Sequence, residues 1–159
     1  MGASGWAYYV PYQPNIGKVL QGLRDEVIRR GEYYKRPAFW TDISEDDYED
    51  EDDKAWLRRM KSLPEPTTIE GLLEWNGEDG TRSIIDISGI AEAPDFGVAA
   101  PLAPQQLMEL FGTDRPTRRM IEEAEEKIQD SRRRWEGTFV IVYKDGTPDE
   151  IFFTGYSGD

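Results

Sequence analysis

The residues best suited to chemistry are the carboxylates of one acidic run, which spans positions 42–53. Nine of its twelve residues are Asp or Glu. The whole chain has a formal net charge of -13, and the residues outside the run contribute only -4 of this charge. Such a concentrated negative field can attract a metal ion, dock a basic macromolecule, or stabilise the start of a helix.

The spacing of the acidic run does not fit a calcium-binding loop. An EF-hand loop needs Gly at its sixth position and Glu at its twelfth, and no register through residues 46–53 supplies that Gly. The chain also has no Cys, which excludes disulfides and thiolate metal ligands. We therefore predict no metal site and no cofactor.

Histidine is absent as well. Its absence excludes a Ser-His-Asp triad, a Cys-His nucleophile and imidazole metal ligands. Catalysis would have to use carboxylates, Lys, Tyr, Ser/Thr or a hard metal such as Mg²⁺ bound by carboxylates. One candidate acid is Asp86, which lies in an apolar segment. In a cleft with Glu74 or Asp145 it could act as a general acid or base, but exposure to solvent or pairing with Arg is the commoner outcome. We assign no catalytic residue.

The interpretation that we favour for the acidic run is a docking surface for a basic protein. Complementary charge raises both the association rate and the specificity of such an encounter. Phe39 and Trp40 precede the run, and Tyr48 lies within it. Aromatic anchors contribute more binding energy than charges at the rim of an interface. Asp52 and Asp53 are instead expected at the start of a helix. The predicted partner-binding residues are Trp40, Glu45, Asp46, Asp47, Tyr48, Glu49 and Asp50.

Other classes of partner are disfavoured. The sole basic triplet is Arg132 to Arg134, and a strongly negative chain is a poor ligand for phosphate backbones, so we predict no nucleic-acid binding. No apolar stretch approaches the roughly 20 residues of a membrane helix, and we recognise no targeting segment. We expect a cytoplasmic protein that does not bind membranes.

Hydrophobic periodicity indicates the elements that must position these groups. Helices are predicted over residues 14–31, 53–62, 69–76 and 104–111, and from 114 or 117 to 134. Strands are predicted over residues 5–10, 82–88, 138–143 and 150–154, with a brief extended piece at 96–99. Residues 139–143 are apolar at every position, which predicts a strand that is central or covered on both faces.

The order of these elements favours an α+β fold. We expect a mostly antiparallel four-stranded sheet with a C-terminal hairpin, and helices packed mainly on one face. Asp145 and Gly146 supply the turn of that hairpin. The length of 159 residues predicts a single domain over 1–159, within which residues 35–52 form a mobile acidic loop.

Three segments, 5–12, 80–87 and 135–159, resemble an uncharacterised family of small bacterial proteins. The resemblance implies a bacterial single-domain protein and assigns no functional residue. We therefore predict a non-enzymatic protein-binding module, of the inhibitor, immunity or regulatory type, that engages a basic partner. The alternatives are a carboxylate-based enzyme or small-ligand binder with an aromatic-lined pocket, and a scaffold domain of a larger assembly.

Overall fold

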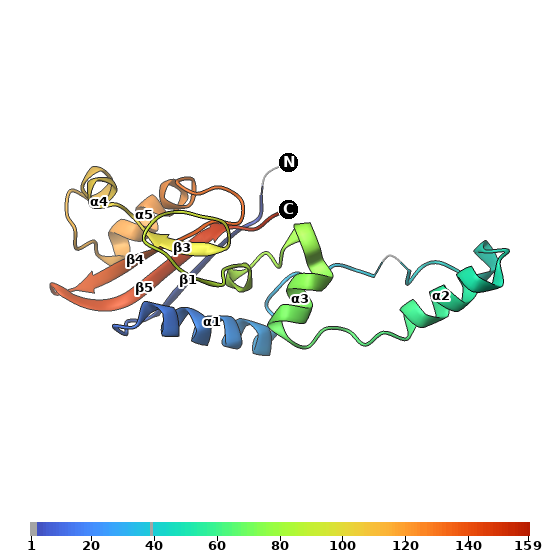
Figure 1. Ribbon diagram of the computed structural model, residues 1–159. Coiled ribbons are helices and arrows are strands. Elements are labelled where there is room, and N and C mark those ends of the chain that lie inside the picture. Colours follow the sequence, from blue (N-terminus) through green and yellow to red (C-terminus); the bar gives the residue numbers. More distant parts are fainter. Residues whose placement is uncertain (1–2, 39) are drawn as a thin grey trace.

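Five α-helices form in the computed structural model, which describes residues 3–38 and 40–159 (Figure 1). The predicted aromatic Phe39 lies outside the described residues. The first helix begins after Asn15, whose side chain accepts a hydrogen bond from the Lys18 amide, and ends at Gly31 in the left-handed conformation. The helices are α1 (Ile16–Arg30), α2 (Glu51–Lys61), α3 (Ile69–Asn76), α4 (Pro104–Phe111) and α5 (Arg118–Gln129).

A five-stranded mixed sheet forms the body. Its strands are β1 (Gly5–Pro11), β2 (Gly89–Ile90), β3 (Val98–Pro101), β4 (Gly137–Lys144) and β5 (Thr147–Tyr156), in the order β1-β5-β4-β3-β2. The α+β class is confirmed, but the prediction of four mostly antiparallel strands was wrong. The pairs β2·β3 and β3·β4 are parallel. Helices α4 and α5 provide the long crossover that the parallel neighbours β3 and β4 require.

The segment 82–88 is not the strand that its apolar residues predicted. Residues Ile84–Asp86 form a short 3-10 helix, and the two-residue strand β2 follows it. The Ser83 hydroxyl accepts a hydrogen bond from the Ile85 amide at 3.2 Å, which gives the backbone a local alternative to strand pairing. A short, continuous apolar run cannot distinguish a strand from another buried conformation.

Helices cover both faces of the sheet, so the expectation that helices pack mainly on one face was wrong (Figure 1). Alternate residues of the central strands point to opposite sides, and Phe139 joins the core beneath α1 while Val140 joins the core beneath α4 and α5. Strand β4, which contains the apolar residues 139–143, lies between β5 and β3, as the sequence predicted for a central strand.

An arm projects from this body between α1 and α3, and it contains α2 (Figure 1). The acidic run lies at its far end, where residues Glu45–Asp47 form a 3-10 turn before α2 begins at Glu51. Among the described residues Leu57 of α2 is 0% exposed yet belongs to neither core cluster. No helix in the described chain is long and apolar enough to cross a membrane.

Candidate functional site

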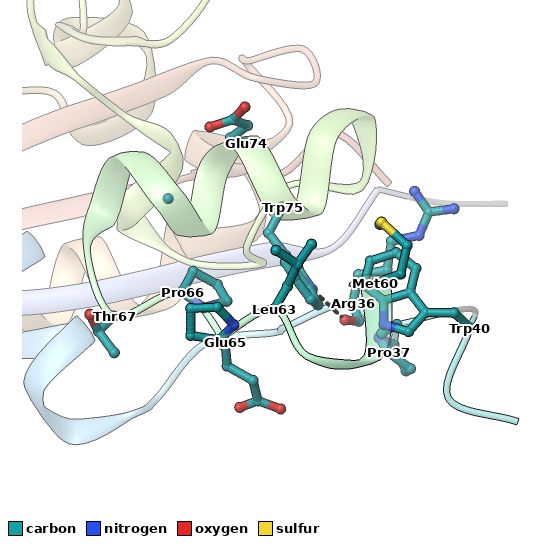
Figure 2. A pocket seen from close by; sticks show the side chains of 13 residues that line it. Arg36, Pro37, Trp40, Met60, Leu63, Glu65, Pro66, Thr67, Glu74 and Trp75 are labelled. Atoms are coloured by element: carbon teal, nitrogen blue, oxygen red, sulfur yellow. Dashed lines mark hydrogen bonds between the residues drawn. The ribbon is translucent and has the colours of Figure 1, made fainter. Parts of the chain in front are cut away.

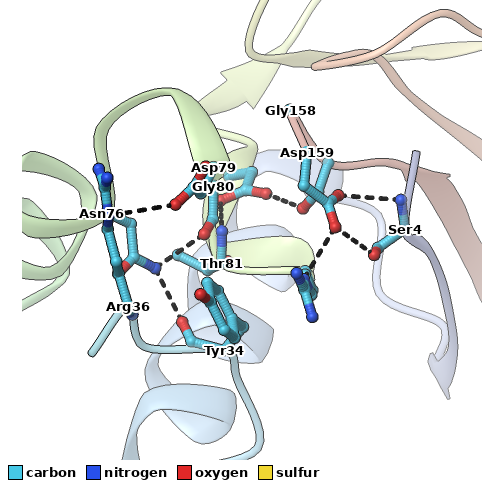
Figure 3. A network of polar contacts seen from close by, with 12 residues as sticks. Ser4, Tyr34, Arg36, Asn76, Asp79, Gly80, Thr81, Gly158 and Asp159 are labelled. Atoms are coloured by element: carbon cyan, nitrogen blue, oxygen red, sulfur yellow. Dashed lines mark hydrogen bonds and ion pairs between the residues drawn. The ribbon is translucent and has the colours of Figure 1, made fainter. Parts of the chain in front are cut away.

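The arm joins the body through two limbs, an outward limb (residues 32–44) and a return limb (residues 62–68). The outward limb is fixed to α3 by Asn76, which is fully buried (Figure 3). Its side-chain amide donates to the carbonyls of Tyr34 and Gly80 at 2.8 and 2.7 Å, and its oxygen accepts from the Arg36 amide at 2.9 Å. One side chain thus holds two nearby positions of the limb against the body.

Further contacts join the outward limb to α3 and to the return limb. The indole nitrogen of Trp75 on α3 donates to the Arg36 carbonyl at 2.8 Å. An ion pair between Lys35 and Glu65 connects the outward limb to the return limb. Pro64 and Pro66 restrict the return limb, because each proline ring fixes its own backbone torsion. The base of the arm is therefore a constrained junction.

An apolar groove of about 770 Å³ lies at this junction, between α3, the two limbs and the end of α2 (Figure 2). Trp40 and Trp75 meet edge to face in its wall, with ring centroids 5.4 Å apart. Leu63 is 44% exposed and Met60 is half-buried, so both offer apolar surface to a ligand. The groove is large enough for one or two side chains of a partner.

The acidic end of the arm, which we call the tip (residues 45–53), uses part of its charge for its own structure. Glu45 pairs with Arg58 at 2.8 Å, and Glu51 pairs with Lys54 at 3.1 Å. The Asp47 carboxylate caps the amide of Ser44. The Asp50 carboxylate accepts a hydrogen bond from the Asp52 amide at 2.7 Å, and Asp50 is thereby the N-cap of α2.

Within the described ranges, four exposed carboxylates of the tip neither pair with a cation nor accept a hydrogen bond from a backbone amide. They are Asp46, Glu49, Asp52 and Asp53. Exposed charges of one sign that are not neutralised in the molecule give a field that extends about 8–10 Å into solvent at physiological salt. The tip is therefore suited to attract a cationic surface.

The structure separates the predicted site residues into two places. Residues 45–50 gather at the tip, where Tyr48 is half-buried and ends the 3-10 turn. Trp40 instead lies in the groove at the base of the arm, away from the acids with which the sequence grouped it. Sequence reasoning missed Trp75, whose position on α3 is remote in sequence from Trp40. Its place on a short amphipathic helix carried no functional signal.

Asp52 and Asp53 were expected at the start of a helix, and both lie in the first turn of α2. Their charge there is favourable to the helix dipole, as the sequence indicated. Both side chains are nevertheless exposed, so they also contribute to the field of the tip. Asp52 and Asp53 therefore stabilise the start of α2 and also contribute to the negative field of the tip.

Asp86, the candidate acid, is 5% exposed and lies outside the groove. It accepts hydrogen bonds from the Thr81 amide at 2.7 Å and from the Ser157 hydroxyl. Burial raises its pKa, and these hydrogen bonds partly oppose that rise. Glu74 lies on the exposed face of α3 and Asp145 in the β4–β5 turn, so neither joins Asp86. A paired-carboxylate site therefore does not form from these residues.

A metal site is not visible in the described part of the chain, where no three acidic side chains gather around one point. No family model matches the sequence. Comparison with curated proteins and with solved structures finds no match either. The geometry of the arm is therefore the basis for a functional proposal.

Proposed function

We propose that the protein is a non-enzymatic, cytoplasmic protein-binding module that engages a basic protein partner through its acidic arm. The observation that carries this proposal is the set of unneutralised, exposed carboxylates at the tip of a projecting arm. A projecting arm can enter a concave partner surface or lie across a flat one. Its charge would steer the encounter and select basic partners.

The groove at the base of the arm supports the same proposal. Interfaces derive most of their affinity from apolar and aromatic contacts that exclude water, whereas exposed charge pairs contribute little. Trp40 and Trp75 provide such a contact surface beside the acidic arm. The acidic tip, which would provide selectivity, is therefore connected through α2 to the aromatic groove, which would provide affinity.

The groove also bears on the alternative of a small-ligand binder or carboxylate enzyme. That alternative requires an aromatic-lined pocket with an acid in a desolvated position. The groove supplies the aromatic lining, but its acids, Glu65 and Glu74, are both exposed. Protein binding is therefore the function that the geometry supports better.

The test is removal of charge from the tip without removal of structure. The tip variant carries Asp46→Asn, Glu49→Gln, Asp52→Asn and Asp53→Asn, which leaves the residues of the internal ion pairs unchanged. A charge-matched control variant changes exposed carboxylates elsewhere: Glu78→Gln, Glu92→Gln, Asp114→Asn and Glu126→Gln. Both variants remove the same net charge.

Affinity capture from the native host, followed by mass spectrometry, compares the two variants with the wild type at low and high salt. We expect the tip variant to lose a basic partner that the wild type and the control retain, and we expect high salt to weaken the wild-type complex. Equal capture by the tip variant and the wild type would contradict the proposal.

A further inference from the structure

The groove and the tip lie at opposite ends of α2, and this fixes the distance between them. Helix α2 has 11 residues. At a rise of 1.5 Å per residue its length is about 16 Å. An extended peptide advances about 3.3–3.6 Å per residue, so about five residues of an extended partner would cover that distance.

The groove itself favours an apolar side chain. Of the charged residues that line it, Arg36 pairs with Asp79 at 3.5 Å and Glu65 pairs with Lys35. In Figure 2 the Glu74 carboxylate points away from the two indole rings. The surface around Trp40, Trp75 and Leu63 is therefore apolar and imposes no demand for a charged ligand atom.

Basic residues separate the groove from the tip. The last turn of α2 contains Arg58, Arg59 and Lys61. Arg58 is neutralised by Glu45, whereas Arg59 is exposed and has no carboxylate within ion-pair distance among the described residues. Lys61 donates to the Ile43 carbonyl and so retains its charge. A partner cation placed directly beside the groove would meet these positive charges, whereas a cation at the tip would not.

We propose that the arm recognises one extended basic segment of a partner protein in two places, with an apolar anchor in the groove and Lys or Arg residues at the tip. This inference rests on the proposed function and adds a spacing to it. The anchor and the cations are separated by about five residues, because that length matches α2. The basic side chains in the last turn of α2 would repel cations of the partner that lie closer to the groove, and they therefore disfavour shorter spacings.

Synthetic peptides provide the probe. The spaced peptide has a Leu-Phe anchor, a flexible Gly/Ser linker that places the first cation about five residues away, and a Lys triplet. A compact peptide has the Lys triplet next to the anchor, and two further peptides lack either the anchor or the Lys residues. Each fluorescein-labelled peptide is made in both chain directions and titrated against the full chain by fluorescence anisotropy.

We expect one direction of the spaced peptide to bind about tenfold more tightly than the compact peptide and than the peptide without an anchor, which corresponds to about 1.4 kcal/mol. Leu63→Ser and Met60→Ser, changes at the rim of the groove, should remove the advantage of the anchor and leave the binding of the anchor-free Lys peptide unchanged. The tip variant should remove the advantage of the Lys triplet. Circular dichroism of each variant verifies that the fold is intact.

The outcomes separate the inference from the proposed function. If the spaced and compact peptides bind equally, or if no spaced peptide binds at millimolar concentration, two-place recognition is overturned. Binding of the anchor-free Lys peptide that depends on the tip carboxylates would still support the proposed function. If the tip variant binds that Lys peptide as tightly as the wild type does, the proposed function fails as well.

Discussion

The indole rings of Trp40 and Trp75 meet at an interplanar angle of 76° with their centroids 5.4 Å apart. Trp40 belongs to the outward limb of the arm, and Trp75 belongs to α3 in the body. This edge-to-face contact, together with the hydrogen bond from Trp75 to the Arg36 carbonyl, couples the arm to the body. The stiffness of the arm should therefore depend on α3.

Trp75→Phe tests this coupling. Phenylalanine keeps an aromatic ring in the groove but cannot donate the hydrogen bond that spans 2.8 Å to the Arg36 carbonyl. Loss of about 1 kcal/mol of local stability should accelerate amide exchange in the outward limb about fivefold. Hydrogen exchange measured by mass spectrometry reads this change. Exchange in α5 provides the internal reference, and unchanged exchange in residues 36–44 would show that the bond does not restrain the arm.

Asn76→Ala should lower the free energy of unfolding by about 2–4 kcal/mol. The change leaves the carbonyls of Tyr34 and Gly80 and the amide of Arg36 without the partner that they have in the wild type. Urea denaturation measures the loss. Asn15→Ala, which removes an exposed helix cap, is the control and should cost about 1 kcal/mol. Equal losses for the two variants would refute the anchoring role of Asn76.

Gly155→Ala should be destabilising by about 2–3 kcal/mol. A Cβ atom at this position would lie 2.5 Å from the Glu136 carbonyl and 2.6 Å from the Trp6 ring. Gly22 in α1 offers the opposite case, because a Cβ atom there has nothing within 4 Å. Gly22→Ala should stabilise the protein by about 0.5–1 kcal/mol. Thermal denaturation should give the two variants shifts of opposite sign, and shifts of the same sign would contradict this packing.

Asp86→Asn should change how stability depends on pH. The pKa of Asp86 is raised above its ordinary value of 3.8 by burial, so the folded state holds the proton more tightly than the unfolded state does. The wild-type free energy of unfolding therefore falls as pH rises from that value to the folded-state pKa. This fall amounts to about 1.4 kcal/mol for each unit between the two pKa values.

The amide introduced by Asp86→Asn has no such titration, but it still offers an oxygen to the backbone amide of Thr81. The difference in stability between this variant and the wild type should increase in favour of the variant over the same pH range. Urea denaturation at a series of pH values up to neutrality measures this difference, with the exposed Glu92→Gln as the control. A difference that is independent of pH would disprove the role assigned to burial.

Arg132→Lys should cost about 2–4 kcal/mol, although it preserves the charge. The buried guanidinium donates to the carbonyls of Ala100 and Pro101 on β3 and to Gly137 on β4, and it therefore clamps a parallel pair of strands. Lysine has one ammonium and cannot reproduce this planar set of donors. Arg133→Lys, at an exposed position, should stay within about 0.5 kcal/mol. Denaturant unfolding of both variants makes the comparison, and equal stabilities would argue against the clamp.

Local patterns in the sequence predicted a large part of the fold. The helix predicted over residues 14–31 matches α1 to within two residues at either end, and the Asp145-Gly146 turn of the hairpin was placed correctly. These features depend on contacts between residues three or four apart or directly opposite across a turn. The segment 82–88 was wrong because uniform burial removes the alternation that distinguishes a strand from other structures.

The acidic tip could be found from the sequence because charge is a property of composition. Trp40 was grouped with the acidic run, whereas the structure places it in the groove at the base of the arm, since its neighbours in sequence are not its neighbours in space. Its partner Trp75 could not be found, because the contact depends on how α3 packs beside the outward limb. No periodicity in either segment encodes that contact.

The sequence by itself determined the helices, the hairpin, the concentration of charge in one run and the exclusion of histidine and cysteine chemistry. The tertiary structure alone decided the parallel pairing of β2, β3 and β4, the covering of both faces of the sheet and the projection of the acidic run on an arm. It also decided the groove, which forms where residues such as Arg36 and Trp75 meet across 39 positions of chain. Contacts of that range depend on the packing of whole elements, which local sequence patterns do not record.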